Sequence, residues 1–352
     1  MNILLLSRYS NLGASSRVRF YQYLPYLTTQ GIQVTVANLF ENDYLEDLYE
    51  GGRRRLFAII GAYIRRLGYM LKSTHYDLVW IEYEILPWLP AWAEIILSHL
   101  GIPYVVDYDD AIFHRYNMHP RAIVRALLGG KIDTVMRQAT LVIVGNEYLG
   151  DYARKAGAKR VECIPSVIDP DRYNSIPQPE NLVFTIGWIG SPATVKYLQL
   201  IRASLAEVCK NGSARLVLVG SGQFKLDGVP TEIHPWCEET EVTEIQSFDV
   251  GIMPMPDSAW AQGKCGYKLI QYMACSRPVI ASPVGVAREI IEDSRNGFLA
   301  TTATDWVRTF CALRDNHRLR EKMGKAGRIK VEKQYSIQIT APLMASLLMS
   351  ID

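Results

Sequence analysis

Short apolar segments with helical stretches between them are the feature that most limits how this chain can fold. In the first half these segments span residues 2–6, 32–39, 77–83, 103–108, 140–146 and 161–166. Strands of a parallel sheet are covered by helices on both faces, so their sequences are near-continuous apolar runs of this kind. The first half is therefore expected to form an α/β domain with a parallel sheet.

The segment 175–181, SIPQPEN, is the best candidate linker, because it contains two prolines and little apolar content. The alternation then restarts, with apolar runs at 182–190, 214–222, 248–255 and 277–283. We expect two α/β domains, 1–175 and 176–337, and a helix in 338–352 that packs back on the first domain. Ligands of open α/β sheets bind at the carboxyl ends of the strands.

Composition and charge exclude several functions. The chain has 352 residues, of which 49% are hydrophobic, and its formal net charge is +2. A dedicated nucleic-acid-binding protein would usually be more basic, so no nucleic-acid partner is expected. The six cysteines are scattered and form no CxxC pair. This spacing argues against a disulfide framework or a zinc site and favours a reducing compartment.

The N-terminal segment MNILLLSRYS has too short an apolar run for a signal peptide and is better interpreted as a first strand. No stretch has about 18 uninterrupted apolar residues, so no membrane span is expected. A cytoplasmic protein is the expectation, and a periplasmic binding protein is disfavoured.

The segment 11–21, NLGASSRVRFY, places two arginines at the start of a predicted helix. Ser15 or Ser16 is the expected N-cap, so that Arg17 and Arg19 fall in the first helical turn. The amino end of a helix is already partly positive, and cations are disfavoured there. Two explanations stay open: the arginines bind an anionic ligand, or they pair with carboxylates elsewhere in the chain.

Cations also precede a helix in the second half. In QGKCGYKLIQYMACSRPVIAS, residues 262–282, a glycine-bearing loop with Lys264 leads into a helix with Lys268. Backbone N–H groups and cations at a helix start suit a phosphate. Glycine turns also follow two other apolar runs, at Gly190–Ser191 and in VGSG, 219–222. Taken singly, each feature is equally compatible with an ordinary turn or a solvated lysine.

Three longer segments make the sequence similar to a known family. GASSRVRFYQYLPYLTTQGIQVTV, VGNEYLGDYARKAGAKRVECIPSVIDPDRY and PVIASPVGVAREIIEDSRNGFLA resemble segments of the family 4 glycosyltransferases, and the third is the most specific. The resemblance covers essentially the whole chain. It implies the GT-B fold: α/β, with two Rossmann-like domains whose parallel sheets face a central cleft.

The resemblance also implies a retaining enzyme that moves a sugar from a nucleotide-sugar donor to a hydroxyl. The nucleotide sugar is the substrate, and no cofactor is expected. Domain 176–337 would bind the donor and domain 1–175 the acceptor. The expected donor-binding residues are Gly190, Ser191, Thr194, Gly220, Gly222, Lys264, Cys265, Gly266, Lys268 and Gln271. The expected acceptor- or phosphate-binding residues are Gly13, Ser15, Arg17 and Arg19.

The chain departs from the family at the E-x7-E motif, where it has Gly263 and Gln271. The family's arginine and lysine after the first donor-domain strand are also missing, so Lys264 and Lys268 are expected to supply the charge. Gln271 can still accept a hydroxyl hydrogen bond, although a neutral acceptor makes a weaker one. The departure keeps open a non-catalytic nucleotide- or carbohydrate-binding protein, or a nucleotide-sugar hydrolase or epimerase.

The expected catalytic carboxylates are Asp107, Asp109 and Asp110, in DYDDAIFHRY. One aspartate is expected to orient or deprotonate the acceptor hydroxyl, and another to hold Arg17 or Arg19. Three close carboxylates also suit a divalent metal, but the family is usually metal-independent and no metal is expected. The nearby His114 fits a packing role at least as well as catalysis.

Residues 51–76 contain six Lys or Arg and no acid. An apolar stripe at helical spacing comprises Leu56, Ile60, Tyr63, Leu67 and Leu71. We expect the stripe to pack on its own sheet, while contact of the segment with an anionic membrane stays open. A polyprenyl-diphosphate-linked glycan as acceptor would give Arg17 and Arg19 an anion. The family resemblance implies a bacterial protein with a role in surface-polysaccharide or glycan assembly, and association with the inner face of the plasma membrane stays open.

Overall fold

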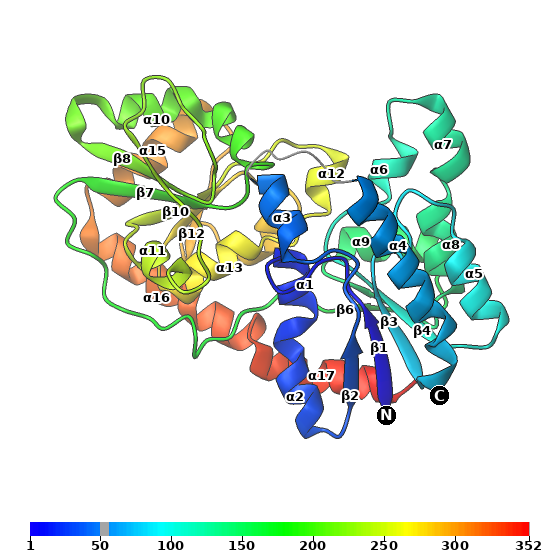
Figure 1. The fold of residues 1–352 in the computed structure, drawn as a ribbon. Helices are drawn as coiled ribbons and strands as arrows, with labels where there is room; N and C mark the ends of the chain where they lie inside the picture. The colour runs from blue at the N-terminus through cyan, green and yellow to red at the C-terminus, as the bar shows by residue number, and fades with distance from the viewer. Residues whose placement is uncertain (50–55, 352) are drawn as a thin grey trace. The chain divides into compact units, whose positions relative to one another are not determined.

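The computed structural model describes residues 1–49 and 56–351, and their packing defines two units. Unit 1 comprises Met1–Ser166, Gln262–Cys265 and Ile337–Asp352. Unit 2 comprises Val167–Ala261 and Gly266–Ser336. The chain first passes from unit 1 to unit 2 after Ser166, which is before the proline-containing segment 175–181. Each unit is built on a parallel six-stranded sheet with helices around it (Figure 1).

The sheet of unit 1 has the strand order β2-β1-β3-β4-β5-β6. Its strands are β1 (Asn2–Leu6), β2 (Gln33–Val36), β3 (Leu78–Glu82), β4 (Tyr104–Tyr108), β5 (Leu141–Val144) and β6 (Val161–Cys163). Ile3 pairs with Val34 on one side and with Leu78 on the other. Strands β3, β4 and β5 are buried along their whole length, because their apolar side chains meet covering layers on both faces.

Helices cover both faces of this sheet. In chain order they are α1 (Ala14–Arg19), η1 (Tyr21–Tyr23), α2 (Leu24–Thr29), α3 (Asn42–Tyr49), α4 (Leu56–Leu71), η2 (Ser73–His75), α5 (Trp92–His99), α6 (His114–Asn117), α7 (Ala122–Leu128), α8 (Lys131–Gln138), α9 (Glu147–Lys155) and α17 (Ile337–Met349). The last helix contacts α2 and belongs to unit 1, where the Tyr23 and Thr340 hydroxyls lie 3.0 Å apart.

The sheet of unit 2 has the order β12-β11-β10-β7-β8-β9. Its strands are β7 (Phe184–Ile189), β8 (Ala214–Val219), β9 (Thr231–His234), β10 (Val250–Met253), β11 (Val279–Ala281) and β12 (Gly297–Leu299). Its helices are η3 (Val195–Ile201), α10 (Arg202–Val208), η4 (Lys210–Gly212), α11 (Glu241–Gln246), α12 (Ala259–Gln262), α13 (Tyr267–Ala274), α14 (Ala287–Ile290), α15 (Ala303–Arg314) and α16 (His317–Gln334). Apolar residues from both sides of the sheet form its cores.

The predicted alternation of strands and helices is confirmed, and the strands that the sequence did not indicate are the edge strands β9 and β12. β9, TEIH, is partly exposed along its length and β12 is three residues long. Edge strands bury less, so their sequences carry a weaker apolar signal. Within the described residues, every helix is too short or too polar to cross a bilayer.

The helix at the first arginines differs from the prediction. Helix α1 is six residues long, its N-cap is Gly13 rather than Ser15 or Ser16, and both Arg17 and Arg19 lie in its last turn. Cations are favoured at the carboxyl end of a helix. The apparent electrostatic conflict therefore disappears, because the helix is much shorter than the apolar periodicity suggested.

The orientation of α4 also differs from the prediction. Leu56, Ile60, Leu67 and Leu71 are exposed, so the predicted stripe does not pack on the sheet. The opposite side of α4 is buried instead, with Ala62 in a small core. The predicted helix begins before residue 56, and that first part lies outside the described residues.

Candidate functional site

Arg19 and Asp107 form a buried ion pair in unit 1. Arg19 Nε and Nη2 donate to the two carboxylate oxygens of Asp107 at 2.8 and 3.0 Å, and Nη1 donates to the Ile164 carbonyl at 2.7 Å. Burial raises the pKa of Asp107 to about 6, although the Arg19 charge opposes this shift. Both side chains are only 1% exposed. The ion-pair explanation therefore applies to Arg19, and the pair braces β4 against α1. The catalytic role of Asp107 stays a prediction.

The other residues predicted to hold an acceptor anion lie nearer the surface of unit 1. Arg17 Nη1 donates to the Asn11 carbonyl at 3.1 Å. Gly13 packs closely on Tyr9, since a Cβ at Gly13 would lie 2.5 Å from Tyr9 Cβ. Ser15 is half-buried. These contacts hold the loop after β1, where Arg17 is only 8% exposed and Ser15 is the more exposed of the two.

Asp109 and Asp110 follow β4, and both are partly exposed. The Tyr83 hydroxyl donates to Asp109, and Lys264 Nζ lies 2.7 Å from Asp110 Oδ1. Tyr83, directly after β3, has a φ of 62°, in the left-handed region that non-glycine residues rarely adopt. Backbone strain of this kind is concentrated at functional sites. Of the predicted catalytic carboxylates, these two retain access to solvent.

The segment Gln262–Cys265 is held on unit 1 by Asn146. Asn146 Nδ2 donates to the carbonyls of Gly263 and Lys264 at 3.0 and 3.3 Å. Its Oδ1 accepts from the Leu149 N–H at 3.0 Å and caps α9. Asn146 lies two residues after the end of β5, so a polar residue near a strand end was the available signal, and the sequence-based site omitted it.

Lys264 and Cys265 have partners in unit 1. Burial lowers the pKa of Lys264, but the Asp110 charge outweighs that effect and the net shift is upward. The Cys265 thiol donates to the Asp109 carbonyl at 3.1 Å. The sequence grouped both residues with Lys268 in one phosphate site. The structure instead gives Lys264 and Cys265 aspartate partners after β4.

The glycine at the first position of the missing E-x7-E motif has a steric explanation. A Cβ at Gly263 would lie 2.6 Å from Ala111 Cβ and 2.9 Å from the Ala111 backbone nitrogen. Real Cβ atoms essentially never approach other atoms so closely. A glutamate could therefore replace Gly263 only if one of the two backbone segments moved.

Glu82, at the end of β3, is a buried carboxylate that sequence reasoning missed. Its Oε2 accepts from the Ser16 hydroxyl and from the Arg8 N–H, both at 2.6 Å. Its Oε1 is buried with no hydrogen-bond partner in the described part of the chain. Burial raises the pKa of Glu82 to about 7. Glu82, the residue before Tyr83, therefore gains or loses its proton near neutral pH.

Glu84 organises a second buried network that the sequence did not reveal. Lys131 Nζ lies 2.5 Å from Glu84 Oε2, and the Tyr116 hydroxyl donates to Glu84 at 2.9 Å. The Trp88 N–H in turn donates to the Tyr116 hydroxyl at 3.0 Å. Trp88 also has a φ of 62°. The loop after β3 therefore contains two strained residues, Tyr83 and Trp88, fixed by buried polar groups.

His114 is engaged in contacts within unit 1. Its Nε2 lies 2.8 Å from the Tyr148 hydroxyl and its Nδ1 lies 3.0 Å from Asn117 Oδ1. Its ring also stands edge-on to Phe113. These contacts favour the packing role over a catalytic one.

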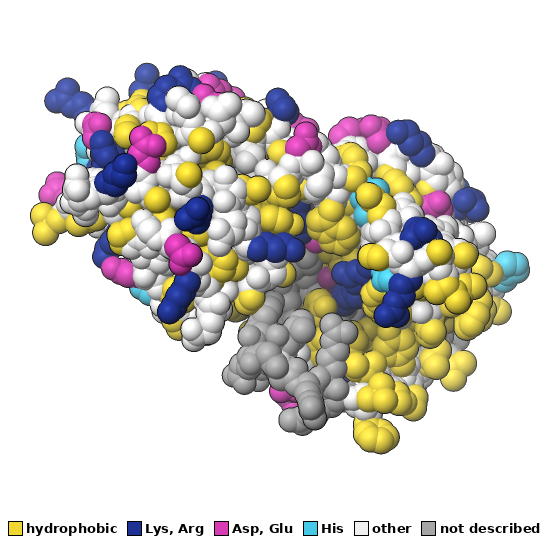
Figure 2. Space-filling model, turned by 90° about the horizontal axis from the view of Figure 1, so that it is seen from above, with side chains coloured by type: hydrophobic (Ala, Val, Ile, Leu, Met, Phe, Trp, Pro, Cys, Tyr) yellow, Lys and Arg dark blue, Asp and Glu magenta, His cyan; other side chains and the backbone are white. Residues whose placement is uncertain are grey.

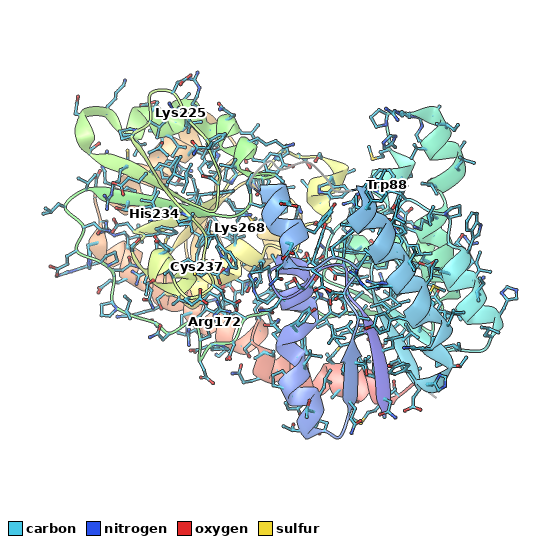
Figure 3. The ribbon with its side chains drawn as sticks, in the orientation of Figure 1. Trp88, Arg172, Lys225, His234, Cys237 and Lys268 are labelled. Atoms are coloured by element: carbon cyan, nitrogen blue, oxygen red, sulfur yellow. The ribbon has the colours of Figure 1, made fainter. Side chains whose placement is uncertain are left out.

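In unit 2, Gly190, Gly220 and Lys268 meet at the carboxyl ends of β7 and β8. A Cβ at Gly190 would lie 2.6 Å from Lys268 Cε, and a Cβ at Gly220 would lie 2.5 Å from the Gly190 carbonyl oxygen. Lys268 Nζ lies 5.2 Å from the centre of the Trp188 ring, a cation–π distance. Lys268, labelled in Figure 3, comes from the first turn of α13. Small residues and a cation thus coincide where the sequence placed donor phosphates.

The loops after β7 and β8 are in contact. Thr194 Oγ1 donates to the Ser191 carbonyl at 3.2 Å, and Ser191 and Thr194 are both half-buried. Gly222 has a φ of 63°, and a Cβ there would lie 3.3 Å from Pro192 Cγ. Thr194 is the N-cap residue of η3, but its side chain caps no backbone group. Ser191, Thr194 and Gly222 therefore form the loops that surround Gly190 at the carboxyl ends of β7 and β8.

Gln271, at the ribose-binding position of the family motif, is buried beside an aromatic and acidic cluster. Its Nε2 donates to the Tyr173 hydroxyl at 3.0 Å. Tyr173 donates to Glu241, and Trp236 Nε1 donates to Glu241 Oε2 at 2.7 Å. A Cβ at Gly220 would lie 3.0 Å from Trp236 Cβ, so this cluster adjoins the glycine turn. Sequence reasoning did not assign Tyr173, Glu241 and Trp236 to the site, because their hydrogen bonds join residues far apart in the chain or away from any glycine turn.

Gly266 begins α13 in a conformation that suits glycine. It is the N-cap residue, with φ 66° and ψ 20°. A Cβ there would lie 2.5 Å from Ile290 Cδ1. A larger residue at Gly266 would therefore displace the start of α13 and with it Lys268.

Among residues 1–49 and 56–351, no group of three or more His, Cys, Asp or Glu is placed to hold a metal ion.

Family models match both halves of the chain. Residues 17–172 match the model described as Glycosyltransferase Family 4, and residues 181–316 match the one described as Glycosyl transferases group 1. The chain belongs to glycosyltransferase family 4. The resemblance seen in the sequence is thereby confirmed.

Solved structures share the fold of this family 4 chain. Sucrose-phosphate synthase from Thermosynechococcus elongatus has a TM-score of 0.73 at 15% identity, over 99% of this chain and 98% of that one. Anabaena HepE in complex with UDP-glucose has a TM-score of 0.72 at 15% identity, over 99% and 100%. WaaG, a glycosyltransferase involved in lipopolysaccharide biosynthesis, has a TM-score of 0.72 at 14% identity, over 99% and 100%. These neighbours confirm the GT-B fold.

One curated relative is similar over part of the chain. D-inositol 3-phosphate glycosyltransferase from Pseudarthrobacter chlorophenolicus is 29% identical over 110 residues, which is 31% of this chain. The match spans 25% of that relative's length. It adds to the family assignment and leaves the substrate of this chain to be inferred from the site.

Proposed function

We propose that this chain transfers a sugar from a UDP-sugar, bound by unit 2, to an acceptor hydroxyl with retention of anomeric configuration. The observation that carries the proposal is the meeting of Gly190, Gly220 and Lys268 at the carboxyl ends of β7 and β8. Two glycine turns let a diphosphate approach the backbone closely, and Lys268 supplies a positive charge beside them. The structure of HepE with UDP-glucose supports a uridine nucleotide as the donor carrier.

Lys268 has a defined role in this proposal. Breaking the bond between the anomeric carbon and the diphosphate oxygen leaves negative charge on the departing diphosphate and an oxocarbenium-like sugar. The Lys268 ammonium, held over the Trp188 ring, offsets that charge without reorganising. Such preorganised electrostatic stabilisation is usually the largest single contribution to catalysis.

Gln271 is the proposed ribose contact. Its Nε2 is engaged with Tyr173, so its carbonyl oxygen is the group that accepts a ribose hydroxyl. Glu241 and Tyr173 fix the amide orientation through the hydrogen bonds described above. Within the proposed donor site, Ser191, Thr194, Gly222 and Gly266 shape the backbone around the phosphates.

Unit 1 is proposed to bind the acceptor. Asp109 or Asp110 accepts the proton of the attacking hydroxyl, because these carboxylates after β4 retain exposed surface. Arg17 and Ser15 would meet an anionic group, and a polyprenyl-diphosphate-linked glycan carries one. Such an acceptor places the enzyme in bacterial surface-polysaccharide or glycan assembly, at the cytoplasmic face of a membrane. The lipopolysaccharide role in the printed description of WaaG supports this class of acceptor.

The test is product analysis with purified protein. UDP-, GDP-, dTDP- and CMP-sugars are incubated separately, with and without a lipid extract containing polyprenyl-linked glycans, and free nucleotide and sugar are quantified. We expect UDP release that depends on the extract, with the sugar recovered in the lipid fraction.

Other outcomes contradict the proposal in distinguishable ways. Free sugar formed equally without extract would indicate a nucleotide-sugar hydrolase, and a changed sugar on intact nucleotide would indicate an epimerase. Nucleotide binding without turnover in any mixture would favour a non-catalytic binding protein, which the replacement of E-x7-E by Gly263 and Gln271 makes a specific alternative.

A further inference from the structure

A row of large apolar side chains lies on the outer face of α4. The exposed residues are Phe57, Ile60, Ile64, Leu67 and Leu71, spaced by three and four residues, which places them on one side of a helix. Phe57 is 89% exposed and Leu71 is 83% exposed. Isolated exposed apolar residues are ordinary, but a continuous patch of this length marks an interaction surface.

The patch continues onto α5. Trp92, Ile96 and Leu100, at successive four-residue intervals, are also exposed. The Tyr63 hydroxyl of α4 donates to the Pro87 carbonyl at 2.6 Å, so α4 lies against the loop that leads into α5. Figure 2 shows hydrophobic side chains gathered over unit 1, at the lower right of that view.

The segment that carries the patch is rich in basic residues. From residue 51 to residue 76 the sequence contains six Lys or Arg and no Asp or Glu. Of these, Arg65 and Lys72 are exposed on α4 and just after it, with Arg65 Nη2 lying 3.9 Å from the carboxylate of the exposed Glu41. Arg53–Arg55 lie outside the described residues. Arg66 does not belong to the surface, because it is buried and donates to the Ser7 carbonyl.

We propose that the outer face of α4 and α5 docks on an anionic phospholipid bilayer, with α4 parallel to the membrane plane. Apolar side chains would enter the headgroup boundary while Arg65 and Lys72 meet lipid phosphates. Trp92 suits this depth, because an indole has an apolar body and one N–H donor. Pairing with a second copy is disfavoured, since residues 51–76 contain no acid and the nearby Glu41 already pairs with Arg65 of its own chain. The proposal stands independently of the transfer reaction.

Vesicle co-sedimentation tests the surface. The full chain is mixed with vesicles of phosphatidylcholine alone or with one third phosphatidylglycerol, at 0.1 and 0.5 M NaCl. The variant Phe57→Ser/Ile64→Ser/Leu71→Ser removes apolar area from the patch. The matched control, Leu182→Ser/Leu200→Ser, removes exposed leucines from unit 2. Circular dichroism and UDP binding, which the proposal assigns to unit 2, verify that each variant is folded.

We expect the wild type to bind the anionic vesicles. This binding should be weaker at high salt, because salt screens the attraction between the basic residues and the lipid phosphates. The triple variant should partition at least tenfold less, and the control should match the wild type. No wild-type binding, equal binding by the triple variant, or equal binding to neutral vesicles would overturn the proposal. So would a wild-type dimer that the triple variant loses, because a second copy would then cover the patch. A wild type that binds the anionic vesicles but does not bind UDP would count against the proposed donor site and not against the membrane surface.

Discussion

The carboxyl ends of the strands differ between the two sheets. In unit 1, β3 and β4 end in carboxylates that already have partners: Glu82 accepts from Ser16, and Asp107 is paired with Arg19. In unit 2, β7 and β8 are followed by glycines, with Lys268 beside them. The two parallel six-stranded sheets thus carry different residue types at the carboxyl ends of their strands. Buried charges hold unit 1 together, whereas unit 2 presents small residues and a cation.

This difference shows why a pattern of charges in sequence has to be weighed against burial. Arg17, Arg19, Lys264 and Lys268 gave the same signal, a cation near a helix start. Arg19 is buried against a carboxylate and Lys264 is paired with one. Lys268 lies against glycine and indole. Of the four, Lys268 is the cation that the proposed donor site uses.

The largest expected effect is on the buried pair of unit 1. Arg19→Ala leaves the Asp107 carboxylate buried and without its cation, which should lower the free energy of unfolding by about 3–5 kcal/mol. Arg17→Ala, the matched control on the same helix, removes a cation that donates to the Asn11 carbonyl, leaves no buried carboxylate without its cation, and should cost about 1 kcal/mol. Urea unfolding measures both. Equal small losses would mean that the Arg19–Asp107 pair does not brace α1 against β4.

The next effect is a pH dependence from Glu82. Burial raises its pKa to about 7 from an ordinary value of 4.5, so the folded state keeps a proton that the unfolded chain releases. This contribution to stability is present below pH 4.5 and is lost as the pH rises through 7. Glu82→Gln cannot ionise, so its stability relative to the wild type should rise by about 3 kcal/mol between pH 4 and pH 8.

Urea unfolding of the two proteins at several pH values tests this dependence. The matched control is Glu147→Gln, which alters an exposed glutamate on α9 of the same unit. A difference between wild type and Glu82→Gln that does not change with pH would refute the protonated state of Glu82.

A smaller effect is expected at the glycine edge of unit 2. Gly220 and Gly31 have nearly equal positive φ values, 75° and 74°. A Cβ at Gly31 would meet no atom within 4 Å, whereas one at Gly220 would lie 2.5 Å from the Gly190 carbonyl oxygen. Gly31→Ala should therefore cost only the backbone strain, about 1 kcal/mol. Gly220→Ala should cost about 1–2 kcal/mol more, because overpacking adds to the strain.

Thermal or urea unfolding compares the two glycine variants. Equal losses at both positions would show that the contact between Gly220 and Gly190 is loose, and that close packing does not define this edge.

The sequence predicted the fold because its evidence is local. Apolar runs, glycine turns and the linker prolines each lie within a few residues, and the two parallel sheets followed from them. The partners of the charges could not be predicted in the same way. Arg19 pairs with a residue 88 positions away, and Lys264 with one 154 positions away. Glu82, Asn146 and Glu241 were missed because their significance depends on burial and on hydrogen bonds across the fold.

Donor binding by unit 2 is the central claim, and calorimetric titration of UDP into three proteins tests it most directly. Wild type should bind, and Lys268→Ala should bind about 10–100-fold more weakly, since a charge-assisted contact to a phosphate contributes about 1.5–3 kcal/mol. The control Lys196→Ala removes an exposed cation of the same unit and should bind like the wild type. Equal affinity of wild type and Lys268→Ala would contradict the claim.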